Sequence, residues 1–82
     1  MEIVKITWVD SKGVTGEWEY KDDIKSLEPA LVTSVGFLLE NKPQYKTIVQ
    51  SDSGEQLMGR LTIPNKCIKK SETVILLKEK GD

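Results

Sequence analysis

Apolar and polar residues alternate along most of this chain, with the period of two that is typical of β-strands. The clearest run is Ile3–Val9, in which Val4, Ile6 and Trp8 share one face, so we predict that Trp8 belongs to the core. The longest run, Ala30–Glu40, is apolar on both faces and predicts partial burial of both. Further strands are predicted at Tyr45–Gln50, Leu57–Ile63 and Thr73–Leu77.

The segment between the first two of these strands is polar and rich in turn residues. Asp10–Gly13 predicts a turn, and Gly16–Tyr20 predicts a short extended piece with its aromatic residues on one face and its glutamates on the other. Lys21–Leu27 predicts about two helical turns, since acidic residues stand near its start, where a helix favours negative charge. Pro29 ends this helix, because the residue before a proline is pushed towards extended geometry.

Two details of the strands predict a curved sheet. Gly36 lies inside the longest strand, where a glycine usually marks a sharp bend or a close backbone approach. Pro64–Ile68 predicts a single short 3₁₀ turn before the last strand. We therefore expect an all-β protein, a small and strongly bent SH3-like or Sm-like barrel of about five strands with one short helix. An α+β fold is the alternative.

The length of 82 residues allows one small domain, residues 1–82, with residues 78–82 expected to be a frayed tail. A core of this size is thin and often needs reinforcement. The lone Cys67 cannot form an internal disulfide, and a chain with one cysteine and no histidine offers no zinc site, so we expect neither a metal nor a cofactor. By elimination, we expect reinforcement by self-association into a homo-oligomer.

Charge is balanced over the whole chain but not along it. The net charge of −1 gives no general attraction to nucleic acid or to an anionic membrane. Residues 1–40 carry four basic and eight acidic residues, whereas residues 41–82 carry eight basic and five acidic ones. This asymmetry reflects either a polar binding face or head-to-tail packing of subunits, or else chance scatter over solvated faces.

Signals for targeting and for catalysis are missing from the sequence. The N-terminus lacks a secretory leader, and no apolar run approaches the roughly 20 residues of a membrane helix, so we expect a cytoplasmic protein without membrane contact. The chain has no histidine, no nucleophile elbow and no glycine-rich phosphate loop. We therefore expect a binding protein and not an enzyme.

Five residues are candidates for ligand binding. Trp18, flanked by glutamates, is either a lid on the core or an exposed ring on which a base can stack. Arg60 and Lys66 belong, with two later lysines, to the one basic group with a sensible geometry, which either binds phosphates or is ordinary solvated charge. Asp10 and Ser11 either anchor a ligand or form a polar turn.

The last predicted strand carries the candidate oligomer interface. A terminal strand that is buried on one face should alternate, yet this one is apolar on both faces. Either another subunit covers its outer face or its edge, or the strand is central in the sheet. The interface residues are Thr73, Val74, Ile75, Leu76 and Leu77.

Three segments, Ile6–Ser11, Ser34–Glu40 and Gly59–Pro64, resemble those of small uncharacterised proteins encoded by bacteriophages and prophages. The resemblance covers most of the chain and implies a phage setting and a role in the host cytoplasm, but no activity. With the features above, it leads us to expect a non-catalytic, self-associating module that captures a nucleotide or another anionic ligand. The alternatives are a module that inhibits or redirects a host protein, and an Sm-like RNA-binding protein.

Overall fold

The computed structural model describes residues 1–77, which form one antiparallel sheet of five strands. The strands are β1 (Ile3–Asp10), β2 (Ala30–Asn41), β3 (Tyr45–Asp52), β4 (Leu57–Pro64) and β5 (Ile68–Val74), in the order β4-β3-β2-β1-β5 across the sheet. The helical content of the described residues consists of two 3₁₀ turns, η1 (Lys21–Asp23) and η2 (Asn65–Cys67). The all-β prediction is confirmed, as is the short turn before the last strand.

The main core cluster follows from the alternation of apolar residues along the strands. Val4 and Ile6 of β1 are buried, and Trp8, on the same face, is half-buried and packs against them. The Trp8 indole Nε1–H donates a hydrogen bond of 3.0 Å to the Ser34 hydroxyl oxygen. The core cluster consists of Val4, Ile6, Ile48 and Ile63, with Trp8, Leu38, Cys67 and Ile68 packed against it.

β2 changes partners along its length, and this change bends the sheet. Its first part, Ala30 to Phe37, pairs with β1, whereas Phe37 to Asn41 pairs with β3. Gly36 lies at the change, and a Cβ atom added there would be 2.9 Å from the carbonyl oxygen of Val49. The predicted close backbone approach at Gly36 is therefore confirmed, because no larger side chain fits without a shift of backbone.

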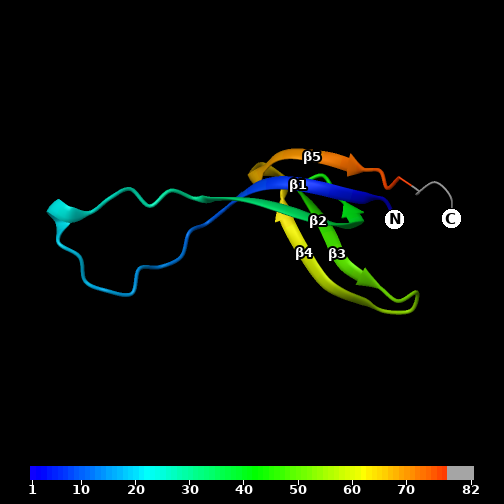
Figure 1. Cartoon of the computed structure of the whole chain (residues 1–82), viewed down its shortest axis with the longest axis horizontal. Coiled ribbons are helices and arrows are strands. Elements are labelled where there is room, and N and C mark those ends of the chain that lie inside the picture. The colour runs from blue at the N-terminus through cyan, green and yellow to red at the C-terminus, as the bar shows by residue number, and fades with distance from the viewer. Residues whose placement is uncertain (78–82) are drawn as a thin grey trace.

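The bent sheet is open, so the expectation of a closed barrel is not met. β4 and β5 form its two edges and do not pair with each other in the described residues. They are joined only by η2, and Ile63 of β4 and Ile68 of β5 pack on the same core. The edges therefore approach each other at the η2 end, and the sheet curls around one side of its core (Figure 1).

The last strand differs from its predicted range. β5 begins at Ile68 instead of Thr73, and it ends at Val74. The reason is its pairing with β1, because Val74 lies opposite Ile3, the first residue of β1, and no further partner remains for Ile75. Ile75, Leu76 and Leu77 therefore lie beyond the sheet and are exposed. The predicted frayed tail, residues 78–82, lies outside the described residues.

Residues 11–29, which we call the arm, project away from the sheet (Figure 1). Every residue of the arm is exposed, and the predicted helix at 21–27 shrinks to η1 because its apolar residues have no surface to pack on. The predicted extended piece at 16–20 belongs to no strand. The arm gives the chain a radius of gyration of 17.7 Å, against about 12 Å for a compact domain of this length.

Within residues 1–77, no helix is long and apolar enough to cross a membrane. The same residues contain no group of three or more histidine, cysteine or acidic side chains placed to hold a metal ion.

Candidate functional site

A hollow of about 390 Å³ lies beside η2, where the turn between β2 and β3 meets the end of β4. The backbone N–H of Asn65 donates a hydrogen bond of 2.9 Å to the carbonyl oxygen of Gln44, and this bond ties the two segments together. Each segment contributes a proline, whose ring provides a rigid apolar wall. The residues that line this η2 hollow are Pro43, Gln44, Pro64, Asn65 and Lys66.

Asn65 has one polar group satisfied and one unsatisfied. Its amide Nδ2 donates to the carbonyl oxygens of Lys42, at 3.0 Å, and Pro43, at 3.1 Å, which fixes the orientation of the side chain. Its Oδ1 is buried and accepts no hydrogen bond from the described residues. A buried acceptor without a donor is unfavourable by about 1–3 kcal/mol. The side chain of Asn65 is therefore held by its two Nδ2 hydrogen bonds.

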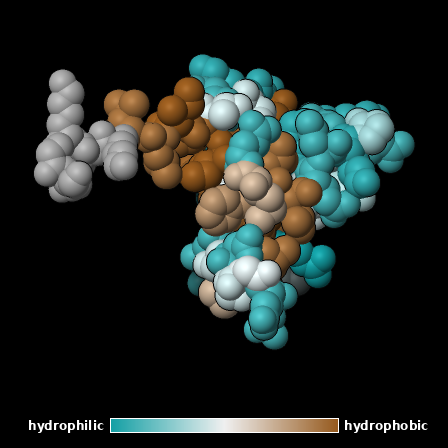
Figure 2. Space-filling model, turned by 90° about the vertical axis from the view of Figure 1, so that its right-hand side faces the viewer, coloured by the Kyte–Doolittle hydropathy of each residue, from teal (hydrophilic) through white to brown (hydrophobic). Residues whose placement is uncertain are grey.

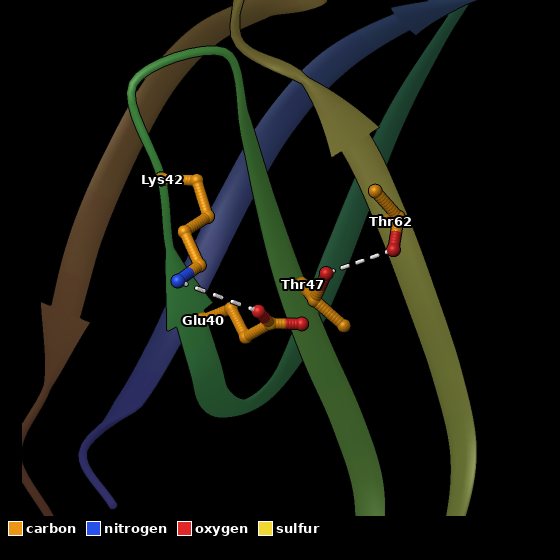
Figure 3. Close-up of polar contacts among 4 residues, drawn as sticks. All are labelled: Glu40, Lys42, Thr47 and Thr62. Atoms are coloured by element: carbon orange, nitrogen blue, oxygen red, sulfur yellow. Dashed lines mark hydrogen bonds and ion pairs between the residues drawn. The ribbon is translucent and has the colours of Figure 1, made fainter.

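The two lysines near this hollow differ in their electrostatic state. Lys42 forms an ion pair with Glu40, with Nζ and Oε2 separated by 3.8 Å (Figure 3). Lys66 is exposed and forms no ion pair within residues 1–77. Lys66 is therefore the cation available to an anion in the η2 hollow. Figure 3 also shows the hydrogen bond of 2.8 Å between the hydroxyls of Thr47 and Thr62, which joins β3 to β4.

The other predicted ligand residues lie elsewhere. Arg60 is exposed on β4, four residues before Pro64, which is about 13 Å along the strand. Trp18 is fully exposed, at 104% of its reference area, and does not cover the core. Asp10 accepts a hydrogen bond of 2.8 Å from the backbone N–H of Ser11, the next residue. Of the five candidate ligand residues, Lys66 is the one that lines the η2 hollow.

Sequence reasoning missed the other four lining residues, and one signal for them was present. The β3–β4 hairpin is symmetrical about its turn, so Tyr45 lies opposite Pro64. Counting outward from Gly54 and Glu55, which flank the centre of this pairing, would have predicted that pair. That pairing brings the segments on either side of the hairpin together. The burial of Asn65 Oδ1 has no sequence signature, because it depends on side-chain packing.

The predicted oligomer interface lies partly within β5 and partly beyond its last residue. Thr73 and Val74 close the strand, whereas Ile75, Leu76 and Leu77 follow it with 79%, 74% and 90% of their areas exposed. β5 is an edge strand, so the alternative of a central last strand is wrong. Figure 2 shows apolar surface beside the grey C-terminal atoms and towards the middle of that face.

Comparisons of the chain with known protein families, with curated proteins and with solved structures give no match.

Proposed function

We propose that the protein is a non-catalytic, self-associating binding module that captures a nucleotide-type or other anionic ligand in the η2 hollow. One observation carries the ligand class: Lys66, which forms no ion pair within residues 1–77, lines the hollow together with two prolines and Asn65. A nucleotide has a phosphate that can accept a charge-assisted hydrogen bond from the Lys66 ammonium. Pro43 and Pro64 offer apolar walls to its ring.

The balance of buried and exposed apolar residues supports self-association. Within residues 1–77, five apolar residues are buried, whereas fifteen large apolar residues are exposed. A soluble monomer rarely exposes so much apolar surface without a partner for it. The strand order, the bent β2 and the turn η2 support an SH3-like or Sm-like module that is closed by association and not by its own edges. The phage setting and the host cytoplasm belong to the proposal through the sequence resemblance alone.

The test is a panel of mono-, di- and cyclic nucleotides, measured by calorimetry with thermal shift as a screen. Lys66→Ala should weaken any hit by about tenfold or more, because it removes a charge-assisted hydrogen bond. Lys69→Ala is the matched control, since Lys69 is exposed nearby but does not line the hollow. No binding anywhere in the panel, or equal weakening by both variants, contradicts this ligand site.

RNA binding is the second candidate function, because basic residues are concentrated in one segment of the chain. Residues 57–74 carry Arg60, Lys66, Lys69 and Lys70 against one glutamate, a net charge of +3. An RNA strand could follow these residues from β4 to β5, whereas a single nucleotide could not. RNA binding would weaken steeply with salt and would need Arg60 as well as Lys66. If no nucleotide or RNA binds, capture of a host protein becomes the leading function.

A further inference from the structure

β4 is an edge strand, and several of its apolar side chains are exposed. Of its eight residues only Ile63 is buried, and Leu57, Met58 and Leu61 are among the exposed large apolar residues. An exposed apolar edge is a template for pairing with another strand. The opposite edge, β5, is blunted by lysines, which discourage such pairing. The two edges therefore differ, and β4 is the one that the fold leaves open to a partner.

A second hollow, of about 300 Å³, lies beside this edge. It is found where β2 and β3 diverge, because β2 pairs with β3 only from Phe37 onward. Gly59 and Leu61 of β4 line it on the same side of the strand. We call it the β4 hollow. A side chain arriving along the β4 edge on that side would enter it.

The arm contains a segment that fits a strand but has no partner. In Val14–Tyr20, Val14, Gly16, Trp18 and Tyr20 alternate with Thr15, Glu17 and Glu19. Tyr20 has extended backbone angles, φ −72° and ψ 134°, and all seven residues are exposed. The arm carries three basic and five acidic residues, so its net charge of −2 is opposite to that of the β4–β5 segment.

We propose that Val14–Tyr20 of one chain adds an antiparallel strand to β4 of a second copy, with Trp18 opposite Gly59. The proposal rests on the self-association proposed above and identifies the surfaces that make it. In this register, Glu17 lies opposite Arg60, which forms no ion pair within residues 1–77. Opposite charges directly across two strands stabilise their pairing, as does an aromatic ring beside a glycine in an edge strand.

The remaining pairs of the register are also compatible. Tyr20 meets Leu57, an aromatic–aliphatic pair, and Thr15 meets Thr62, and both kinds of pair are favourable across strands. Residues directly opposite each other point to the same face, so Trp18 enters the β4 hollow beside Gly59 and Leu61. A slip by one residue would turn Trp18 to the other face and set Glu17 away from Arg60.

The exchange is reciprocal in a twofold dimer. Each chain has one arm and one β4 edge, so the same contact forms twice when two copies are related by a twofold axis. The arm already points away from its own sheet (Figure 1). In the dimer, Trp18 of each chain would then cover the β4 edge of the other chain.

The first measurement is the mass in solution, by light scattering and by sedimentation over a range of concentrations. The wild-type chain should show twice its mass of 9.2 kDa at micromolar concentration. Trp18→Ser should raise the dimer dissociation constant by about tenfold or more, because it removes a large buried ring. Ile24→Ser is the matched control, since Ile24 is exposed in the same arm but lies outside the paired segment, and it should change the constant little.

A charge swap tests the register. Glu17→Arg and Arg60→Glu should each weaken the dimer, because each places like charges opposite one another. The double variant should recover most of the affinity. Circular dichroism of each variant checks that the sheet is intact, so a loss of dimer is not confused with a loss of fold.

A disulfide cross-link tests the same pairing directly. In a Cys67→Ser background, Glu19→Cys with Met58→Cys should form a covalent dimer, since these residues lie opposite each other in the register. Thr15→Cys with Met58→Cys is the off-register control and should remain uncoupled. A cross-link within one chain would show the arm on its own β4 and would overturn the proposal.

Two further outcomes overturn it and separate it from the proposed function. A clean monomer at high concentration removes both the arm exchange and the proposed self-association, whereas ligand binding to the η2 hollow can still be measured. A dimer that survives Trp18→Ser and Glu17→Arg but is lost in Leu76→Ser removes the arm exchange alone. Self-association would then run through the residues after β5.

Discussion

The sheet and the arm are two parts of one chain that reach opposite states. In the sheet, β1 has a partner on each side, and its residues Val4 and Ile6 are 3% and 0% exposed. In the arm, Val14 and Trp18 are fully exposed, and η1 is the only regular element. Both parts contain alternating apolar residues. The difference is that the sheet segments have neighbours within the chain and the arm has none.

This contrast shows that alternating apolar residues allow a segment to form a strand but do not by themselves make it one. A strand is stabilised only when a second strand takes up its backbone hydrogen bonds and its apolar face. β1 finds β2 and β5 by folding, whereas Val14–Tyr20 finds no partner in its own chain. The arm therefore either remains unpaired in solution or pairs with a strand of a second molecule.

The largest expected effect is a core deletion in the sheet compared with the same deletion in the arm. Ile6→Ala should lower the free energy of unfolding by about 2–5 kcal/mol, because it opens a cavity in a fully buried site. Ile24→Ala should change it by less than about 0.5 kcal/mol, since its side chain is already exposed. Urea unfolding at a concentration where the chain is monomeric measures both. Equal losses would show that the arm packs on the sheet in solution.

A smaller effect is expected at the bend of β2. Gly36→Ala should destabilise the protein by about 1–3 kcal/mol, because its Cβ would lie 2.9 Å from the Val49 carbonyl oxygen and 3.2 Å from Ile48 Cβ. Gly16→Ala is the control in the arm, where no atom lies within 4 Å of an added Cβ. Thermal unfolding of the pair compares the two. If Gly36→Ala melts like the wild type, the sheet is less tightly bent than described.

The smallest effect concerns one polar contact inside the sheet. Thr47→Val should lower the free energy of unfolding by about 1 kcal/mol, since Thr47 is buried and its hydroxyl bonds that of Thr62 at 2.8 Å. A double-mutant cycle with Thr62→Val isolates the contact, and Thr33→Val, on the exposed side of β2, is a control for the substitution itself. A coupling energy near zero would mean that the bond does not stabilise the pairing of β3 and β4.

Much of the fold was predictable because the signals were local. The strands β1 to β4 lie within two residues of their predicted ranges, since each has alternation and flanking turn residues of its own. β5 was misplaced because Ile68–Ser71 reads as polar, and only its pairing with β1 makes it a strand. The helix at 21–27 failed for the opposite reason, as its apolar residues had a periodicity but no surface to cover.

The candidate site was less predictable. Lys66 was identified from its charge and its place in a turn, and the structure adds Asn65 as its neighbour in the η2 hollow. Trp18 and Arg60 had been grouped with Lys66 by residue type, yet within residues 1–77 Lys66 lines the η2 hollow and Trp18 lines a separate one. Residue type indicates what a side chain can bind, whereas only the packing of distant segments decides which side chains share a site.

The sequence by itself determined where β1 to β4 lie, because a period of two is a property of neighbouring residues. Only the tertiary structure decided the order of the strands, the change of partner in β2 and the meeting of Pro43 with Asn65 beside η2. It also decided that the sheet stays open and that the arm stays unpaired. These features depend on contacts between residues far apart in the chain, and such contacts form only when the whole chain has packed.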